Sequence, residues 1–177
     1  MASRKTATAW AVTGAWTIRS ADGAARGRRG ARLSGGRSQV NHEDGRRVSE
    51  TRRVLIADDD YKYRATLARL VEALGLTCIL AEDGATAAAL LEDSTQEFHL
   101  VITDFRMPRG SGWRVVEAAR EHRGASFPVI MQTAEAQYAD VYTKAEALGV
   151  PLIAKDDIHA LLVPAVRAAL NLGDGDG

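Results

Sequence analysis

From residue 53 onward, the sequence alternates five short apolar runs with five segments of helical periodicity. The apolar runs have the length of strands and occupy residues 53–57, 76–81, 99–103, 127–132 and 150–154. Between them, apolar residues recur every three or four positions, as at Leu67, Leu70, Val71 and Leu74, which is the period of one helix face. Strands that are apolar on both faces are typical of a parallel sheet covered by helices. The pattern predicts an α/β fold, a doubly wound five-stranded parallel sheet flanked by helices.

The helical segments carry start and stop signals. They occupy residues 61–74, 83–91, 112–123, 138–148 and 158–169. Gly75 is a stop signal after the first, and Asp83 can cap the second. Asp156 and Asp157 can cap the last helix in the same way. Pro164 is predicted to kink or delay that helix unless it falls in the first turn, because proline lacks the N–H that a helix interior needs.

The first part of the chain has a different composition. Residues 1–53 carry 12 basic and 4 acidic side chains, a net charge of +8, and residues 54–177 carry a net −8. Between residues 23 and 36 the only large aliphatic side chain is Leu33, so this stretch cannot bury enough apolar surface to offset the entropy of ordering. We therefore expect a disordered basic extension over residues 1–52, a folded domain over 53–172 and a flexible tail over 173–177.

The basic extension leaves several functional alternatives open. It could contact nucleic acid or an acidic partner, although we consider nucleic acid the less favoured of these. Its composition is also similar to that of an organellar transit peptide, and residues 7–16 have a weak similarity to a signal peptide. Because no Met lies between Met1 and Met107, native translation could also start at a non-Met codon near Val40 or Val48.

Several classes of protein are excluded or disfavoured by composition. A single cysteine, Cys78, rules out an intrachain disulfide framework and a zinc site with several cysteines. The absence of an 18-residue apolar run argues against a membrane-spanning helix. There is no phosphate-binding glycine loop of the P-loop or dinucleotide type, so nucleotide binding has no support.

Chemically reactive side chains follow four of the five apolar runs. Asp58 and Asp59 follow the first run, Asp104 the third, Thr133 the fourth and Lys155 the fifth. The carboxyl ends of parallel strands meet at one edge of a sheet, so these side chains are expected to converge there. Each of them alone is more simply explained as a turn, helix-start or structural residue, and their conjunction is what points to a site.

Crowded carboxylates repel one another, and a hard divalent cation removes that repulsion. Mg²⁺ prefers oxygen ligands, so a few carboxylates are enough to hold it. A metal, an ammonium group and a hydroxyl are the groups that stabilise a transferring phosphoryl group. One carboxylate beside the metal can then serve as the nucleophile and form an aspartyl phosphate.

The order and spacing of these residues resemble the receiver domain of two-component response regulators. The matching pieces are VLIADDD at 54–60, LVITDFRMPRGSGW at 100–113, VIMQTA at 129–134 and PLIAK at 151–155. All four occur in order within a matching β/α frame, and the resemblance covers residues 53–172.

The resemblance implies a role for each matching residue. Asp104 would be the phosphoacceptor, Asp59 a direct Mg²⁺ ligand, and Asp58 its partner acting largely through water. The backbone carbonyl of Arg106 would complete the protein ligands of the metal, and Thr133 and Lys155 would contact the phosphoryl group.

The resemblance also implies partners. A histidine kinase or phosphotransfer protein in the cytoplasm would donate the phosphoryl group, and the chain would catalyse only its own phosphorylation and dephosphorylation. Because the sequence ends in GDGDG after residue 172, we expect a stand-alone receiver of the chemotaxis type that signals through protein contacts. The output protein is unknown, and a homodimer is one possibility.

Two positions depart from the family pattern. Leu152 stands where the family commonly has an aromatic switch residue, and Asp156 stands where it usually has proline after the lysine. One alternative is therefore a pseudo-receiver that interacts without phosphorylation. A second is an aspartyl-phosphate phosphatase of the haloacid-dehalogenase type, but that class has a second Asp two residues after the nucleophile, where this chain has Arg106.

Overall fold

The computed structural model describes residues 52–134 and 139–173. The predicted basic extension lies outside these residues except for Arg52, and so does the predicted C-terminal tail except for Gly173. Tyr138, the expected first residue of the fourth helix, also lies outside them.

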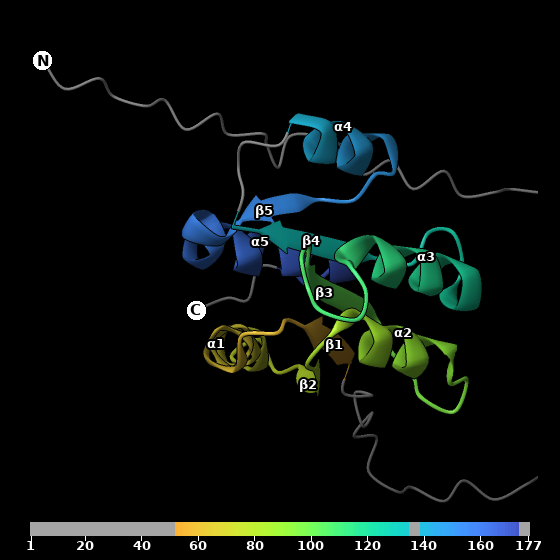
Figure 1. The fold of residues 1–177 in the computed structure, drawn as a ribbon. Coiled ribbons are helices and arrows are strands. Elements are labelled where there is room, and N and C mark those ends of the chain that lie inside the picture. Colours follow the sequence, from red (N-terminus) through yellow and green to blue (C-terminus); the bar gives the residue numbers. More distant parts are fainter. Residues whose placement is uncertain (1–51, 135–138, 174–177) are drawn as a thin grey trace, which may run out of the picture. The chain divides into compact units, whose positions relative to one another are not determined.

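The described residues form a five-stranded parallel sheet with helices between the strands (Figure 1). In chain order the elements are β1 (Arg53–Ala57), α1 (Tyr61–Glu72), β2 (Thr77–Ala81), α2 (Gly84–Glu92), β3 (Leu100–Asp104), α3 (Gly112–Arg123), β4 (Val129–Thr133), α4 (Ala139–Ala147), β5 (Leu152–Ala154) and α5 (Ile158–Leu170). The strand order is β2-β1-β3-β4-β5, and every pair of neighbours is parallel. The predicted fold class is confirmed.

Two apolar cores, one on each face of the sheet, hold the layers together. Helices α1 and α5 bury residues such as Leu67 and Leu162 against one face, together with Ile56 and Ile102 of the sheet. Helices α2 and α3 bury their apolar residues on the other face, against Leu55 and its neighbours (Figure 1). Alternate residues of the inner strands therefore enter opposite cores, which is why these strands are apolar on both faces over most of their length.

Two prolines explain why β4 and β5 each begin two residues later than the predicted apolar run. Pro128 and Pro151 each offer a carbonyl to the neighbouring strand, accepting from the amides of Val101 and Met131. Neither has an N–H to donate, so the regular ladder begins only after them. Val150, before Pro151, is 4% exposed, and Phe127, before Pro128, is half-buried against the same core.

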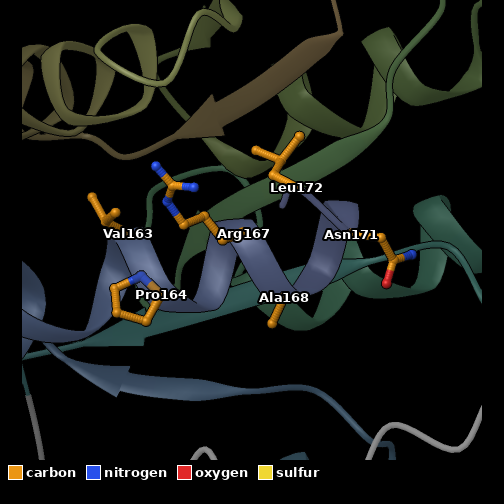
Figure 2. Close-up of a pocket in the computed structure, with 6 residues that line it drawn as sticks. All are labelled: Val163, Pro164, Arg167, Ala168, Asn171 and Leu172. Carbon is orange, nitrogen blue, oxygen red and sulfur yellow. The ribbon is translucent and has the colours of Figure 1, made fainter. Parts of the chain in front are cut away.

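The expectations for the last helix need two corrections. Helix α5 runs without interruption through Pro164, which lies on its exposed side, so the start of the helix is not delayed (Figure 2). The carbonyl of Ala160 that loses its partner lies on that exposed side, where water can reach it. Asp157 stands at the N-cap position but makes no side-chain cap hydrogen bond, because a short 3₁₀ turn at Lys155–Asp157 precedes the helix and the Ile158 amide bonds to the Lys155 carbonyl.

A close backbone contact joins the start of α2 to the loop after β3. A Cβ atom placed on Gly84 would lie 1.9 Å from the carbonyl oxygen of Gly110, closer than any real contact. We expect Gly84→Ala to lower the free energy of unfolding by about 3 kcal/mol, because backbone on both sides must move. Urea unfolding checks this, with Gly173→Ala as the control, since nothing lies within 4 Å of a Cβ at Gly173. Equal unfolding midpoints for the two variants would contradict the prediction.

Candidate functional site

Three carboxylates gather at the carboxyl ends of β1 and β3. These strands are neighbours in the sheet, so Asp104 at the end of β3 lies beside the residues that follow β1. Asp58, Asp59 and Asp104 each bring one carboxylate oxygen within 4.8 Å of the other two. The third acid of the run, Asp60, is separate from the cluster. It caps α1 by accepting hydrogen bonds from the amides of Lys62 and Tyr63, at 2.9 and 3.2 Å.

Lys155 supplies the positive charge of the site. Its Nζ lies 2.8 Å from Asp58 Oδ2 and 3.3 Å from Asp104 Oδ2, so one ammonium group bridges two carboxylates. Burial on its own would lower the pKa of Lys155, but the hydrogen bonds and charges of Asp58 and Asp104 outweigh it and raise that pKa. The lysine therefore stays charged at neutral pH.

Asp104 is held in a defined orientation in a nearly dry environment. It is 6% exposed, and its Oδ1 accepts a hydrogen bond of 2.9 Å from the backbone amide of Phe105. Burial raises the pKa of Asp104 to about 6, with the charge of Asp58 adding to the effect and that of Lys155 opposing it. At neutral pH the carboxylate is ionised but poorly solvated, which suits an oxygen nucleophile.

The remaining residues singled out by the sequence lie on β4, on β5 and in the loop after β3. Thr133 ends β4, is 2% exposed, and pairs in register with Ala154, the residue before Lys155. Arg106 lies two residues after Asp104, in the loop toward α3, with its side chain exposed. Leu152 is half-buried at the start of β5 and packs against the core that α2 and α3 cover. The residues that the structure brings together at this edge are Asp58, Asp59, Asp104 and Lys155, four of the strand-end residues from which the site was predicted.

The oxygen donors fit a hard divalent cation. Three carboxylates converge within one small volume, one of them with an exposed side chain and two buried. A single ammonium group cannot balance three negative charges, so the cluster retains an excess of negative charge that a cation would neutralise. Oxygen donors of this kind select Mg²⁺ and similar ions over softer metals.

Two further residues of the site, and one in the loop that follows Asp104, were not singled out by the sequence. Gln132 is fully buried in β4, and its Nε2 donates a hydrogen bond of 3.0 Å to Asp58 Oδ2. Tyr63 of α1 places the centroid of its ring 4.5 Å from Lys155 Nζ, and burial together with the charges of Asp58 and Asp104 raises the pKa of Tyr63. Gln132 could have been noticed as a polar residue in an apolar strand, whereas nothing in the sequence of α1 indicates that Tyr63 reaches this lysine.

The third is Arg109, which fastens the loop after β3. Its guanidinium pairs with Asp83, which is 1% exposed, and with Glu82 at 3.2 Å. Asp83 meanwhile caps α2 by accepting from the Thr86 amide at 2.8 Å. Arg109 has a φ of 56°, a left-handed conformation that costs a non-glycine residue free energy, and the ion pairs offset this cost.

Two hollows on the surface lie away from the carboxylate cluster. One, of about 550 Å³, runs along the second half of α5 and is lined by Val163, Pro164, Arg167, Ala168, Asn171 and Leu172 (Figure 2). The other lies near the amino ends of the strands, with Phe98, His99 and Phe127 among its lining residues. In the described ranges, no helix is long and apolar enough to cross a membrane.

Comparison with known proteins places this geometry in a family. The family model described as "Response regulator receiver domain" matches residues 54–166. "Regulator of RpoS" from Escherichia coli K12 is 37% identical over 99 residues, which cover 56% of this chain and 28% of that protein. "Transcriptional regulatory protein CpxR" from the same strain is 35% identical over 123 residues, or 67% of this chain and 49% of that protein.

A solved structure has the same fold. The CheY-like receiver domain protein from Methanospirillum hungatei superposes with a TM-score of 0.61 at 23% identity, over 68% of this chain and 94% of that one. The chain spans less than half the length of the two curated relatives named above, so the likeness to them concerns one domain. Since the family model covers most of the described β/α frame and the acidic cluster lies within the matched range, the chain belongs to the family of response regulator receiver domains.

Proposed function

We propose that this chain is a phosphoryl-accepting receiver of a two-component system, phosphorylated on Asp104. The observation that carries the proposal is the bridge made by Lys155 between Asp58 and Asp104, inside a cluster of three carboxylates. A structural ion pair needs one carboxylate for one ammonium group. A surplus of buried carboxylates costs stability, and such surpluses are typical of sites that bind a cation or carry out chemistry.

The residues divide the work of phosphoryl transfer. A carboxylate oxygen of Asp104 attacks the phosphorus of a phosphohistidine, forming a P–O bond as the P–N bond breaks and the imidazole leaves with the bonding electrons. Lys155 turns toward the phosphoryl oxygens and neutralises developing charge, and Thr133 donates a hydrogen bond to the same group. Asp58, Asp59, Asp104 and the carbonyl of Arg106 would hold Mg²⁺, which supplies further charge neutralisation when bound.

The signal would leave through protein contacts. A histidine kinase or phosphotransfer protein in the cytoplasm is the proposed donor, and the folded unit over residues 53–172 would present a changed surface to an output protein or a second copy. Phosphorylation shifts the population of two states of the domain by adding one charged group beside Lys155 and Thr133. Since Leu152 cannot act as a gated aromatic ring, we expect the coupling to Thr133 to differ from the Thr–aromatic form usual in the family.

Phosphorylation by a small donor tests the proposal. The chain is incubated with acetyl phosphate and Mg²⁺, and its intact mass is measured. We expect the intact mass to increase by one phosphoryl group, and we expect no increase when EDTA is added before the donor. Borohydride reduction followed by peptide mapping is expected to locate the phosphoryl group at Asp104.

Two other outcomes would replace the proposal. A chain that gains no phosphate from acetyl phosphate or from a phosphorylated phosphotransfer protein would be a pseudo-receiver. Of the two alternatives, the aliphatic Leu152 favours the pseudo-receiver over the phosphatase. Turnover of a generic phosphomonoester would instead indicate a phosphatase.

A further inference from the structure

Gln132 is a buried polar residue that follows three apolar residues in β4. The side chains before it in β4 are Val129, Ile130 and Met131, and Gln132 itself is 0% exposed. Its Oε1 is buried and has no hydrogen-bond partner among the described residues. Leaving such an acceptor unsatisfied costs about 1–3 kcal/mol, which an apolar side chain at this position would avoid. The amide therefore needs an explanation other than packing.

The position of Gln132 brings its amide to the carboxylate cluster. Gln132 pairs in register with Asp104, and its carbonyl accepts a hydrogen bond of 2.8 Å from the Phe105 amide. Successive residues of a strand point to opposite faces, so Gln132 shares a face with Ile130, which lies in the core under α1 and α5. Asp58 shares that face with Ile56 for the same reason, and the two side chains meet there.

The carboxylate of Asp58 accepts hydrogen bonds from three donors, and only two of them are side chains. The Asp60 amide donates to Oδ1 at 2.9 Å. Lys155 Nζ and Gln132 Nε2 both donate to Oδ2, at 2.8 and 3.0 Å. Lys155 is shared with Asp104, whereas the amide of Gln132 is not charged and is fixed in the sheet. If Lys155 turns toward a phosphoryl group on Asp104, Gln132 remains as the side-chain donor to Asp58.

We propose that Gln132 is a positioning residue that keeps the Asp58 carboxylate oriented toward the metal once Lys155 has turned to the phosphoryl group. The inference rests on the proposed function, since it needs both Mg²⁺ and a phosphoryl group at this site. Hydrogen bonds to metal-binding carboxylates orient them, and losing one typically costs tenfold or more in metal affinity. Losing the Gln132 amide should weaken Mg²⁺ binding mainly in the phosphorylated state, because without a phosphoryl group Lys155 itself holds the Asp58 carboxylate.

Mg²⁺ affinity, measured by calorimetry with and without beryllofluoride as a mimic of the phosphoryl group, tests this role. The variant is Gln132→Met, which conserves volume and removes the amide, with Gln132→Leu as a second variant should the first fail to fold. The control is Met131→Leu, a buried neighbour that points to the opposite core. We expect Gln132→Met to weaken Mg²⁺ binding about tenfold in the presence of beryllofluoride and less than about threefold in its absence. Met131→Leu should leave both affinities unchanged.

The possible results separate this inference from the function on which it rests. Equal losses of affinity with and without beryllofluoride, or no loss at all, would overturn the role of Gln132 while leaving the proposed function in place. Wild-type protein that binds neither Mg²⁺ nor beryllofluoride would overturn both. A selective loss in the presence of the mimic supports the inference, because a residue that only fills space would affect the two states alike.

Discussion

Lys155→Met is expected to slow phosphorylation by acetyl phosphate about a hundredfold or more at saturating Mg²⁺. The ammonium group lies within 3.3 Å of the proposed nucleophile, in a site where Asp58 and Asp104 are almost completely buried. A fixed charge in such a dry environment acts strongly on charge that develops during the reaction, and removing one such donor usually costs two to three orders of magnitude. Intact-mass measurement of the phosphorylated fraction over time gives the rate.

The same substitution should also change stability, in a way that depends on the metal. Without Lys155 the buried carboxylate of Asp58 loses its charged partner, and breaking a buried pair from one side costs about 3 kcal/mol or more. We expect this loss in EDTA and a smaller one in Mg²⁺, because the cation then neutralises the same carboxylates.

Lys144→Met is the matched control for Lys155→Met. Lys144 is exposed on α4, and its Nζ stacks 4.5 Å from the centroid of the Trp113 ring. It makes no contact with the carboxylate cluster among the interactions that the structure describes, so its loss should leave the phosphorylation rate within about twofold of wild type. A Lys155→Met protein that is phosphorylated as fast as this control would exclude the lysine from the chemistry.

The order of strands and helices along the chain could be predicted from the local sequence pattern, because each strand carries its own burial signal. The bounds predicted for β1 and α3 agree with the structure, since clear polar or glycine residues flank both. The starts of β4 and β5 could not be predicted as well, because Phe127 and Val150 are apolar and packed but precede a proline that cannot enter the ladder. At these two positions a residue can be buried without taking part in the hydrogen bonds of the sheet. An apolar run in the sequence indicates only burial.

The convergence of the carboxylates could be predicted because parallel strands bring their ends to one edge. Contacts that depend on how far a long side chain extends could not be predicted from the sequence. Arg109 meets Asp83 across two loops, and Tyr63 places its ring against Lys155 from a different layer of the fold. Neither pair has a spacing in the sequence that distinguishes it from ordinary surface residues, so only the three-dimensional arrangement identifies these contacts.

Asp104→Asn is expected to abolish phosphorylation and, at the same time, to stabilise the metal-free protein. The amide is too poor a nucleophile to attack phosphorus, so no phosphate should be found at this position. The stability effect follows from burial, which with the charge of Asp58 raises the pKa of Asp104 to about 6 from its ordinary value of 3.8. The folded state therefore binds this proton more tightly than the unfolded state does.

The sign of the pH dependence follows directly from that displacement. Protonated Asp104 contributes full stability below about pH 4, and this contribution is lost as the pH rises through about 6. Asparagine carries no charge and loses nothing over that range. In EDTA we expect Asp104→Asn to exceed wild type by about 2 kcal/mol in the free energy of unfolding at pH 8, and by much less at pH 4.5. Urea unfolding at the two pH values measures the difference.

An exposed carboxylate provides a control of opposite sign. Hydrogen bonds from the hydroxyl and amide of Thr95 lower the pKa of Asp93, so Asp93→Asn should leave stability unchanged or reduce it at pH 8. Adding Mg²⁺ should narrow the gap between wild type and Asp104→Asn, because the cation favours the ionised carboxylate that only wild type has. Two results would contradict this prediction: an Asp104→Asn protein less stable than wild type at pH 8, or a difference in the free energy of unfolding that widens toward low pH. Either would mean that Lys155 already compensates the charge of Asp104 fully, and that the carboxylates have no surplus charge for a cation to neutralise.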